Sequence, residues 1–262
     1  MDLALAQGGI ELKQFFRTRE SLVFTLLFPI MLMVIFGSIF QNVPTADPTV
    51  SLSQYFVTGM IASGFLATGF QNLAITIPIE RDRGVIKRYR ATPMPKWIYF
   101  VGKAFSVGAL ALVSTVLLLI VALLFYDIKL PDTAEKWGTF AWVSVLGLVS
   151  FALLGVAMSS ATPTGRSAPA VVTPIALVLQ FTSGVFFEYS LLPDWMQQFA
   201  AIFPLKWVTQ GLRSVFLPES FAAKEVAGSF EPGKTAIILA AWCVGGLILC
   251  LLTFKWTTKR DG

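Results

Sequence analysis

The sequence predicts an all-α, polytopic membrane protein, and three observations support this fold class. Apolar residues make up 55% of the 262 residues, and charged residues make up only 13%, roughly half the share in a typical globular chain. The apolar residues gather in long runs that are separated by short polar segments. Because a membrane-crossing helix needs about 20 apolar residues, the chain has room for six transmembrane helices, and residues 1–262 are expected to form a single membrane domain.

Residues 1–20 mix apolar and polar types and are expected to form an amphipathic helix in the membrane interface. A secretory signal peptide is the alternative, but the apolar run that follows is too long for one. Pro29 predicts a kink in the first span, and Pro78 is expected to end the second. The six membrane spans are expected at residues 21–40, 54–77, 98–126, 139–160, 169–187 and 236–254.

The distribution of basic residues predicts the orientation of these spans. If the N-terminus is cytoplasmic and six spans alternate, the inner segments hold 14 of the 20 basic residues and the outer segments hold 6. The acidic residues show the opposite bias, with 9 of 15 in outer segments. We therefore expect a multi-pass protein of a prokaryotic plasma membrane with both termini in the cytoplasm.

The segment 78–97 between spans two and three carries the densest charge cluster in the sequence. Its candidate coupling residues are Glu80, Arg81, Asp82, Arg83, Gly84, Lys87 and Arg88. A solvated turn that fixes the topology needs only a few basic residues. Here Val85, Ile86 and Tyr89 recur among the charges, and this pattern favours a short helix that docks onto a cytoplasmic subunit.

The outer segment 188–235 is interrupted by four prolines and contains two amphipathic stretches. Leu192, Trp195 and Phe199 share one face of the first stretch. Pro193 suits the first turn of that helix, and Pro204 is expected to end it. One interpretation is an ordinary pair of interfacial helices, and the other is a pair that caps the exit of a cavity.

Several kinds of chemistry are excluded by composition. The chain has no histidine, which removes histidine-based catalysis and most transition-metal sites. No acidic residue falls within an expected span. Residues 228–235 fit the spacing of a phosphate-binding loop, but they lie on the expected outer side of the membrane, so they are not expected to bind ATP. Cys243 and Cys250 lie about 10 Å apart along one helix, too far for a disulfide. The chain is therefore expected not to be an enzyme and to bind neither metal nor cofactor.

Four sequence motifs occur in a fixed order along most of the chain. They are Glu80-Arg81-Asp82-Arg83-Gly84 followed by Arg90-Ala91-Thr92-Pro93, then Gly184-Val185-Phe186-Phe187, Leu192-Pro193-Asp194-Trp195, and Phe203-Pro204-Leu205 with Arg213 downstream. In this order the motifs resemble those of ABC type-2 exporter permeases, which include drug-efflux permeases of the daunorubicin-resistance type. Asp82 departs from the glutamate that is common in the family but keeps the charge.

The resemblance implies a permease that pairs with a second copy or a paralogue. Each permease is expected to dock on an ATP-binding-cassette ATPase subunit, which binds the ATP and Mg, through the 78–97 loop and through Phe15, Phe16 and Arg17 of the N-terminal helix. The resemblance also favours a re-entrant outer helical hairpin between spans five and six. Its expected outer gate is formed by Leu192, Pro193, Trp195 and Phe199.

The resemblance places a substrate cavity between spans two and five. The candidate cavity residues are Phe56, Met60, Phe70, Gln71, Thr173, Leu177, Gln180 and Phe181. An apolar wall with few polar groups suits hydrophobic cargo. The alternative role of the polar residues is hydrogen bonding between helices.

The function expected from these features is ATP-driven export of hydrophobic drugs or lipid-like compounds. Export of a lipid-linked polysaccharide is the alternative within the same family. An ion-coupled secondary transporter and a membrane-embedded enzyme are disfavoured because both usually need carboxylates inside the spans. Nucleic-acid binding is disfavoured because the basic residues lie between apolar spans.

Overall fold

The structure, a computed structural model, describes residues 2–17, 23–40, 43–92, 95, 97–126, 128 and 130–254. Within these ranges the chain is helical, and the single β interaction is a bridge between Pro44 and Ser51. This confirms the all-α fold class. The helices are α1 (Asp2–Arg17), α3 (Phe28–Phe40), α4 (Leu52–Phe65), α5 (Asn72–Asp82), α6 (Val85–Ala91), α7 (Trp97–Phe125), α8 (Ala134–Met158), α9 (Ala168–Thr182), α10 (Asp194–Ile202), α11 (Pro204–Phe216) and α12 (Pro232–Thr253). Two π-helical turns, η1 (Val23–Leu27) and η2 (Leu66–Gln71), and two 3-10 turns, η3 (Tyr189–Leu191) and η4 (Glu219–Lys224), complete the order.

Four helices among the described residues are long and apolar enough to cross a membrane. One is the continuous helix Leu52–Asp82, which joins α4, η2 and α5, and the others are α7, α8 and α12. They coincide with expected spans two, three, four and six. At expected spans one and five lie the shorter apolar helices Thr25–Phe40 and α9, each of 10–17 residues.

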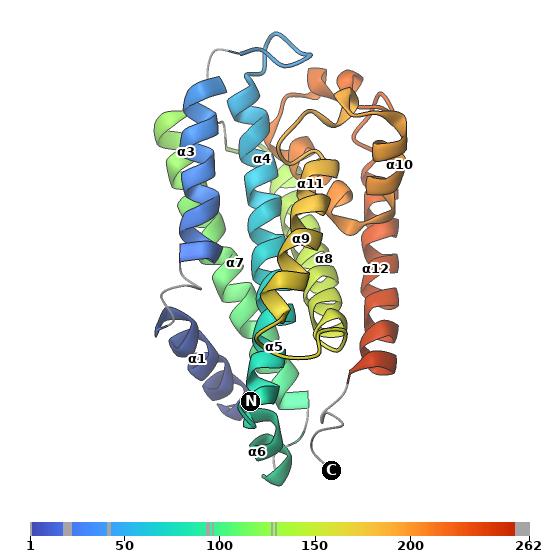
Figure 1. Ribbon diagram of the computed structural model, residues 1–262. Helices are drawn as coiled ribbons and strands as arrows, with labels where there is room; N and C mark the ends of the chain where they lie inside the picture. The colour runs from blue at the N-terminus through green and yellow to red at the C-terminus, as the bar shows by residue number, and fades with distance from the viewer. Residues whose placement is uncertain are drawn as a thin grey trace.

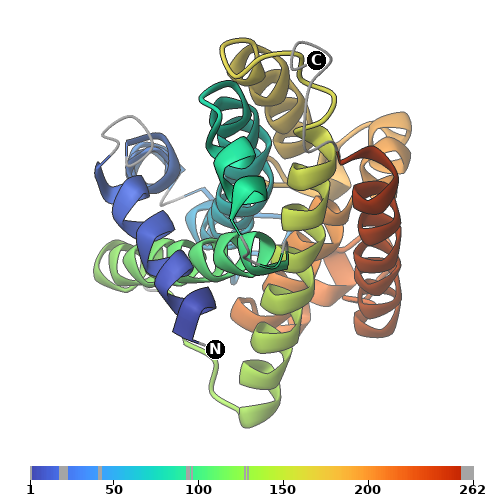
Figure 2. The same cartoon turned by 90° about the horizontal axis from the view of Figure 1, so that it is seen from below.

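The helix Leu52–Asp82, called the central helix below, lies in the middle of the bundle. In an apolar stretch of 18 residues of the central helix, 78% is buried, whereas in the corresponding stretch of α12 only 22% is buried. Figure 1 shows α3 and α7 on one side of it and α8, α11 and α12 on the other. Seen from below, α1 crosses α7 at one edge of the bundle and α12 lies along α8 at the opposite edge (Figure 2). Most of the core therefore forms around one helix.

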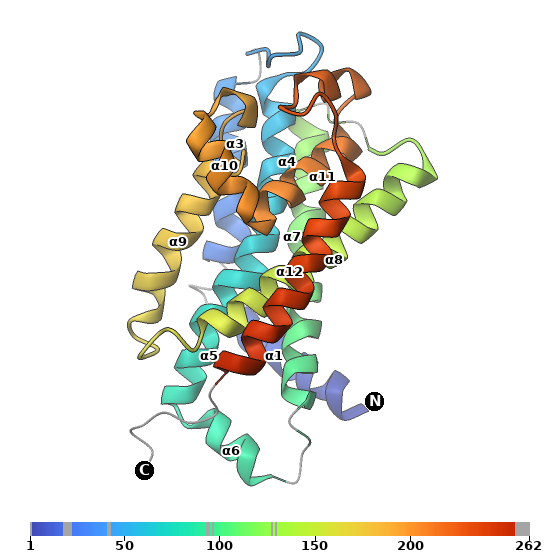
Figure 3. The same ribbon diagram turned by 90° about the vertical axis from the view of Figure 1, so that its right-hand side faces the viewer.

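The elements also divide between the two ends of the bundle. One end carries α6, and the last turns of α12 point toward it (Figure 1). The other end carries the 43–51 loop, α10 and η4 (Figure 3). These ends are called the α6 end and the α10 end below.

The sequence predicts that Pro78 ends the second span, but α5 continues through Pro78 to Asp82. A proline inside a helix removes one backbone hydrogen bond and need not end the helix. Here α5 packs against α8 and α9, and these contacts hold the helix together across the proline. Glu80 and Arg81 are therefore helical and prolong the central helix, and the chain turns only at Gly84, which has a φ of 71°.

The two amphipathic stretches of the outer segment form α10 and α11, which meet at Phe203. Pro193 lies at the N-cap of α10, just before the first turn in which the sequence predicts it. Pro204 follows the end of α10, as predicted, and opens α11. α11 does not lie on the surface. Every one of its residues except Ser214 is buried, because it packs between α4, α8 and α12.

Small residues allow the helices around the central helix to approach closely. The Cβ of an alanine at Gly59 would lie 2.3 Å from the carbonyl oxygen of Val185, and one at Gly155 of α8 would lie 2.7 Å from the carbonyl oxygens of Gly69 and Phe70. Close approach at small residues is a common way to pack helices in lipid. These glycines therefore set the distance between the central helix and its neighbours.

We predict that Gly155→Ala lowers the midpoint of thermal unfolding in detergent, because the added methyl group forces α8 away from the central helix. Gly108→Ala on α7 is the matched control, since no atom lies within 4 Å of the position of its Cβ. That substitution should leave the midpoint unchanged or raise it slightly, since alanine favours a helix by about 1 kcal/mol over glycine. Equal midpoints for the two variants would contradict the close packing of α8.

Candidate functional site

An apolar groove of about 620 Å³ lies between α3, α4 and α9 and extends to the loop after α9. Seven of its 15 lining residues are phenylalanines. Glu188 is the single ionisable side chain among the described residues that line it. The groove therefore offers an aromatic wall with one carboxylate at the α10 end.

The phenylalanines form a continuous series across the three helices. The Phe36 and Phe56 ring centroids are 5.3 Å apart, Phe56 and Phe186 are 6.0 Å apart, and Phe186 and Phe181 are 4.8 Å apart. Phe187, 6.2 Å from Phe181, completes the series beside Glu188. Pairs of aromatic rings at these distances stabilise one another beyond simple burial.

Three of the expected cavity residues, Phe56, Leu177 and Phe181, line this groove. Gln180 does not line it, because its Oε1 accepts a hydrogen bond of 2.9 Å from Ser63 of α4. Gln180 therefore has the alternative role expected for the polar residues of the spans, a hydrogen bond between two helices. Phe70 lines a second apolar groove of about 290 Å³ among α8, α9 and α12.

The remaining expected cavity residues are dispersed. Met60 is fully buried in the core, Gln71 is half-buried at the end of η2, and Thr173 is exposed on α9. Of the expected gate residues, Leu192 lines the 620 Å³ groove. Trp195 is exposed on α10, as is Phe199, whose ring lies 5.1 Å from that of Phe203.

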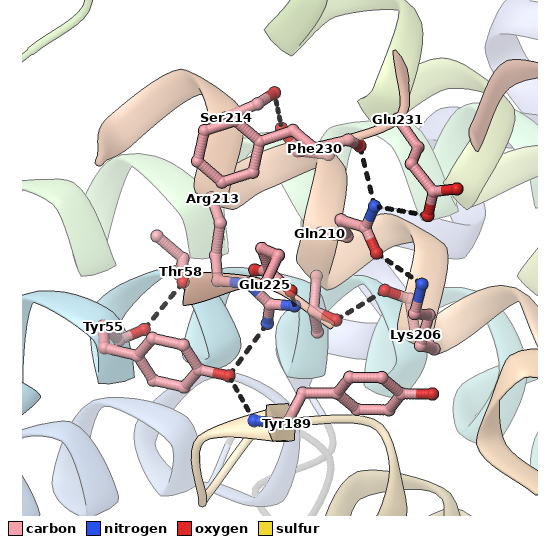
Figure 4. Close-up of polar contacts among 12 residues, drawn as sticks. Tyr55, Thr58, Tyr189, Lys206, Gln210, Arg213, Ser214, Glu225, Phe230 and Glu231 are labelled. Atoms are coloured by element: carbon pink, nitrogen blue, oxygen red, sulfur yellow. Dashed lines mark hydrogen bonds and ion pairs between the residues drawn. The ribbon is translucent and has the colours of Figure 1, made fainter. Parts of the chain in front are cut away.

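A buried polar cluster holds the loop after α9 in place at the α10 end (Figure 4). Arg213 of α11 is fully buried, and its Nε and Nη2 donate to the Glu225 carboxylate at 2.6 and 3.3 Å. Its Nη1 donates at 3.0 Å to the Tyr55 hydroxyl. That hydroxyl also accepts from the backbone N–H of Tyr189 at 3.1 Å and donates to the carbonyl oxygen of Phe187 at 3.3 Å. This outer polar cluster (Tyr55, Tyr189, Arg213 and Glu225) ties α4 and α11 to the rim of the groove.

The outer polar cluster explains why the chain has glycine at position 184. Gly184 has a φ of 75°, a conformation that other residues rarely adopt. A Cβ there would also lie 3.0 Å from the Cβ of Tyr189 and 3.1 Å from the Tyr55 hydroxyl.

Burial raises the pKa of Tyr189 to about 12, so its hydroxyl stays neutral at physiological pH.

Two turns earlier on α11, Lys206 is buried and donates a hydrogen bond to Gln210 (Figure 4). Its Nζ lies 3.5 Å from the centroid of the Trp207 ring, a cation–π contact. Burial and the charge of Arg213 together lower the pKa of Lys206 to about 8.

The charged segment at the α6 end divides into buried and exposed residues. Arg83, Lys87 and Arg88 are exposed on α6 and its approach. Ile86 is buried, and Tyr89 packs 5.6 Å from Tyr99 of α7. The apolar residues of this segment are thus partly used within the chain, and the basic side chains form the exposed surface of α6.

The other residues of this segment bond to the chain itself. Arg81 is buried, and its Nη1 donates to the carbonyl oxygen of Ser159 at 3.2 Å. The Asp82 carboxylate accepts from the backbone N–H of Gly165 at 2.6 Å. Both contacts join the central helix to the connection between α8 and α9.

A second buried cluster links α1 to the central helix. Lys103 of α7 donates to Glu11 at 2.7 Å and to Glu80, and Glu80 also accepts from the Tyr99 hydroxyl at 2.8 Å. All three charged side chains of this inner charged cluster (Glu11, Glu80 and Lys103) are nearly excluded from solvent. Burial raises the pKa of Glu11, although the Lys103 ammonium opposes that rise.

The expected coupling residues of the N-terminal helix lie apart from those of α6. Phe15 is buried against Leu26 and Leu110, whereas Phe16 and Arg17 are exposed. α1 rises away from α6 toward its last residue, so Phe16 and Arg17 lie at its far end (Figure 1). The expected coupling residues thus form two separate exposed surfaces, one of Arg83, Lys87 and Arg88 at α6 and one of Phe16 and Arg17 at the end of α1.

Sequence reasoning missed Tyr55, Glu188 and Glu225. Tyr55 falls within an apolar span, and the two glutamates lie in irregular segments without a periodic pattern. A buried ion pair at Lys103 could have been expected from the sequence, because a lysine inside an apolar run needs a buried partner. The sequence did not show which carboxylates that partner would be.

Glu225→Ala should lower the free energy of unfolding by about 3–5 kcal/mol, because it leaves the Arg213 guanidinium buried without its partner. Glu225→Gln should cost less, since the amide oxygen still accepts one hydrogen bond. Lys136→Ala, which breaks the exposed pair with Asp132, is the control and should leave the unfolding midpoint unchanged. Denaturant unfolding in detergent tests this, and a Glu225→Ala variant as stable as the control would contradict a stabilising role of the cluster.

The lowered pKa of Lys206 predicts how stability varies with pH. Between about pH 8 and the ordinary lysine pKa of 10.5, the unfolded chain binds more protons at this position than the folded protein does. Stability should therefore rise with pH in this range. We expect the difference in thermal midpoint between wild type and Lys206→Met to grow in favour of wild type from pH 7.5 to pH 9.5. A difference that does not change with pH would show that Lys206 keeps an ordinary pKa.

Comparison with known proteins agrees with this arrangement. The ABC-2 type transporter family model matches residues 8–217, which is most of the chain. The chain is 24% identical over 217 residues to the inner membrane transport permease YadH of Escherichia coli strain K12, and the match covers 81% of this chain and 83% of YadH. It is 23% identical over 206 residues to ycf38 of Porphyra purpurea, also named as a transport permease, with 78% of this chain and 70% of ycf38 covered. A shorter match, 22% over 147 residues, covers 56% of this chain and 39% of the probable multidrug ABC transporter permease YbhR of Escherichia coli strain K12.

The family match includes α3 through α11, and so contains the groove, the inner charged cluster and all of the outer polar cluster except Glu225. It confirms the resemblance to ABC type-2 permeases that the four sequence motifs indicate. The chain belongs to the ABC-2 type transporter family and is a multi-pass membrane permease.

Proposed function

We propose that the chain is the transmembrane subunit of an ATP-binding-cassette exporter that moves hydrophobic drugs or lipid-like compounds out of a prokaryotic cell. The observation that carries this proposal is the 620 Å³ groove, whose lining is aromatic and aliphatic apart from Glu188. Binding sites for small molecules are mostly apolar cavities of this size with few polar groups. One relative, YbhR, is named for multidrug transport.

In this proposal all six apolar helices cross the plasma membrane, with both termini and α6 in the cytoplasm and α10 outside. α10 and α11 then form the re-entrant outer hairpin. Support comes from the exposed Arg83, Lys87 and Arg88 at the α6 end, because basic residues favour the cytoplasmic side. At the α10 end, η4 and the 43–51 loop pack together beside the outer polar cluster and cover the bundle.

The energy source in this proposal is a separate ATPase subunit, which holds ATP and Mg while the permease binds no cofactor. The ATPase docks on α6 and on the exposed end of α1. A second permease copy or a paralogue completes the transporter. Support for docking comes from the exposed basic side chains of α6, which the fold itself does not bury.

The first experiment is co-purification from detergent with an ATP-binding-cassette ATPase encoded beside this permease, followed by reconstitution into lipid vesicles. A stable complex whose ATP hydrolysis is stimulated by hydrophobic drugs supports the proposal. If only a lipid-linked polysaccharide stimulates ATP hydrolysis, the cargo is a compound of that class instead. Transport that survives ATP depletion and stops when the proton gradient collapses would replace the proposal with an ion-coupled carrier.

Within the charged segment, the residues proposed to bind the ATPase differ from the residues that stabilise the fold. The double substitution Arg83→Ala with Arg88→Ala removes two exposed charges and should reduce co-purified ATPase and stimulated hydrolysis about tenfold, without changing the thermal midpoint. Glu80→Ala should instead lower the thermal midpoint, because it leaves the buried Lys103 with only one of its two carboxylate partners. Lys136→Ala at the α10 end is the control for loss of an exposed base. Unchanged ATPase binding by the double variant would contradict docking at α6.

A further inference from the structure

Glu188 has an unusual environment for a carboxylate. It is only 6% exposed, and in the described structure it accepts a single hydrogen bond, 3.2 Å from the backbone N–H of Ala46 to Oε2. No described lysine or arginine lies within ion-pair distance of it. A buried charge without a partner is costly, and such groups in membrane proteins commonly mark binding sites.

The surrounding charges do not neutralise Glu188. The nearest arginine that acts on it is Arg213, which is already held by two hydrogen bonds to Glu225. Lys206, the other buried base at this end, donates to Gln210 and lies against the Trp207 and Tyr189 rings, so neither base forms an ion pair with Glu188. Burial raises the pKa of Glu188, although the Ala46 N–H and the Arg213 charge oppose that rise, and the Glu225 carboxylate adds to it.

The aromatic series leads directly to this charge. Phe36, Phe56, Phe186, Phe181 and Phe187 follow one another at centroid distances of 4.8–6.2 Å, and Phe187 precedes Glu188 in the chain. The faces of aromatic rings attract cations, and this attraction grows when water is excluded. A carboxylate at the end of an aromatic groove is therefore complementary to a molecule that combines rings with one positive charge.

We propose that the groove selects hydrophobic organic cations and that Glu188 is the residue that determines this selectivity. The apolar body of the cation lies along the phenylalanines, and its charged group lies against the Glu188 carboxylate. The inference rests on the proposed transport function and narrows its cargo class. It can be tested by equilibrium binding to the permease, without any ATPase.

The test compares two probes of the same shape and opposite charge, tetraphenylphosphonium and tetraphenylborate. Binding of each to the full chain in lipid nanodiscs is measured by equilibrium dialysis, with empty nanodiscs subtracted. Wild type should bind the cation at least about tenfold more tightly than the anion. Glu188→Gln should remove most of this preference, mainly by weakening cation binding. The glutamine oxygen can still accept the Ala46 hydrogen bond, and an unchanged thermal midpoint verifies the fold.

Two further variants separate charge from packing. Glu219→Gln removes an exposed acid at the same end and should leave both affinities unchanged. Phe187→Leu keeps an apolar side chain but removes a ring, and should weaken binding of the cation more than binding of the anion.

Acidification provides an independent check, because tetraphenylphosphonium keeps its charge at every pH. The titratable groups that act on Glu188 are Arg213 and Glu225, and Tyr55 lies in the same cluster. Cation binding should weaken in wild type as pH falls through the Glu188 pKa, and should not change with pH in Glu188→Gln.

Equal affinity of wild type for the two probes, or an unchanged preference in Glu188→Gln, would overturn the inference. Absence of saturable binding of both probes would overturn it as well and would leave the groove to lipid or to a second copy of the chain. None of these results would remove the proposed ATP-driven transport, which fails if no ATPase associates with the permease or if transport survives ATP depletion. The two ideas can therefore fail separately.

Discussion

The central helix, Leu52–Asp82, meets a buried charged cluster at each of its ends, and the rest of the bundle depends on this arrangement. Tyr55 near its start bonds Arg213, and Glu80 near its end bonds Lys103. The two positions are about 38 Å apart along a straight helix. Between them the helix presents apolar and small residues, so packing is close in the middle and polar bonds fix both ends. In an apolar solvent such bonds must be satisfied within the protein.

This arrangement gives the proposed transporter a physical link between its two ends. The groove lies beside the first half of the central helix, and α6 follows its last turn. α9 forms the other wall of the groove and is held by the Ser63–Gln180 bond and by packing on η2, α5, α10 and α11. A displacement of α6 would therefore reach the groove through one continuous helix, which contains the π-helical turn η2 and Pro78.

Several sequence patterns determined structure directly because they act locally. Pro193 and Pro204 set the starts of α10 and α11, and long apolar runs gave the positions of four helices long enough to cross a membrane. Pro78 shows the limit of local reasoning. Its missing N–H favours a helix end, but packing of α5 against α8 outweighs one lost hydrogen bond. The role of Gln180 was likewise open until the structure placed it against Ser63.

By itself, the sequence determined the membrane class, the helical fold, the family motifs and the charged segment before α7, because these follow from composition, periodicity and residue order. Only the tertiary structure decided which charges are buried together. Arg213 and Glu225 are twelve residues apart, but Lys103 and Glu11 are separated by 92 and Tyr55 and Arg213 by 158. Hydrophobic patterning fixes which face of a helix is buried. The partners of a buried charge depend on the distances and rotations between helices, which side-chain packing sets and the local sequence does not encode.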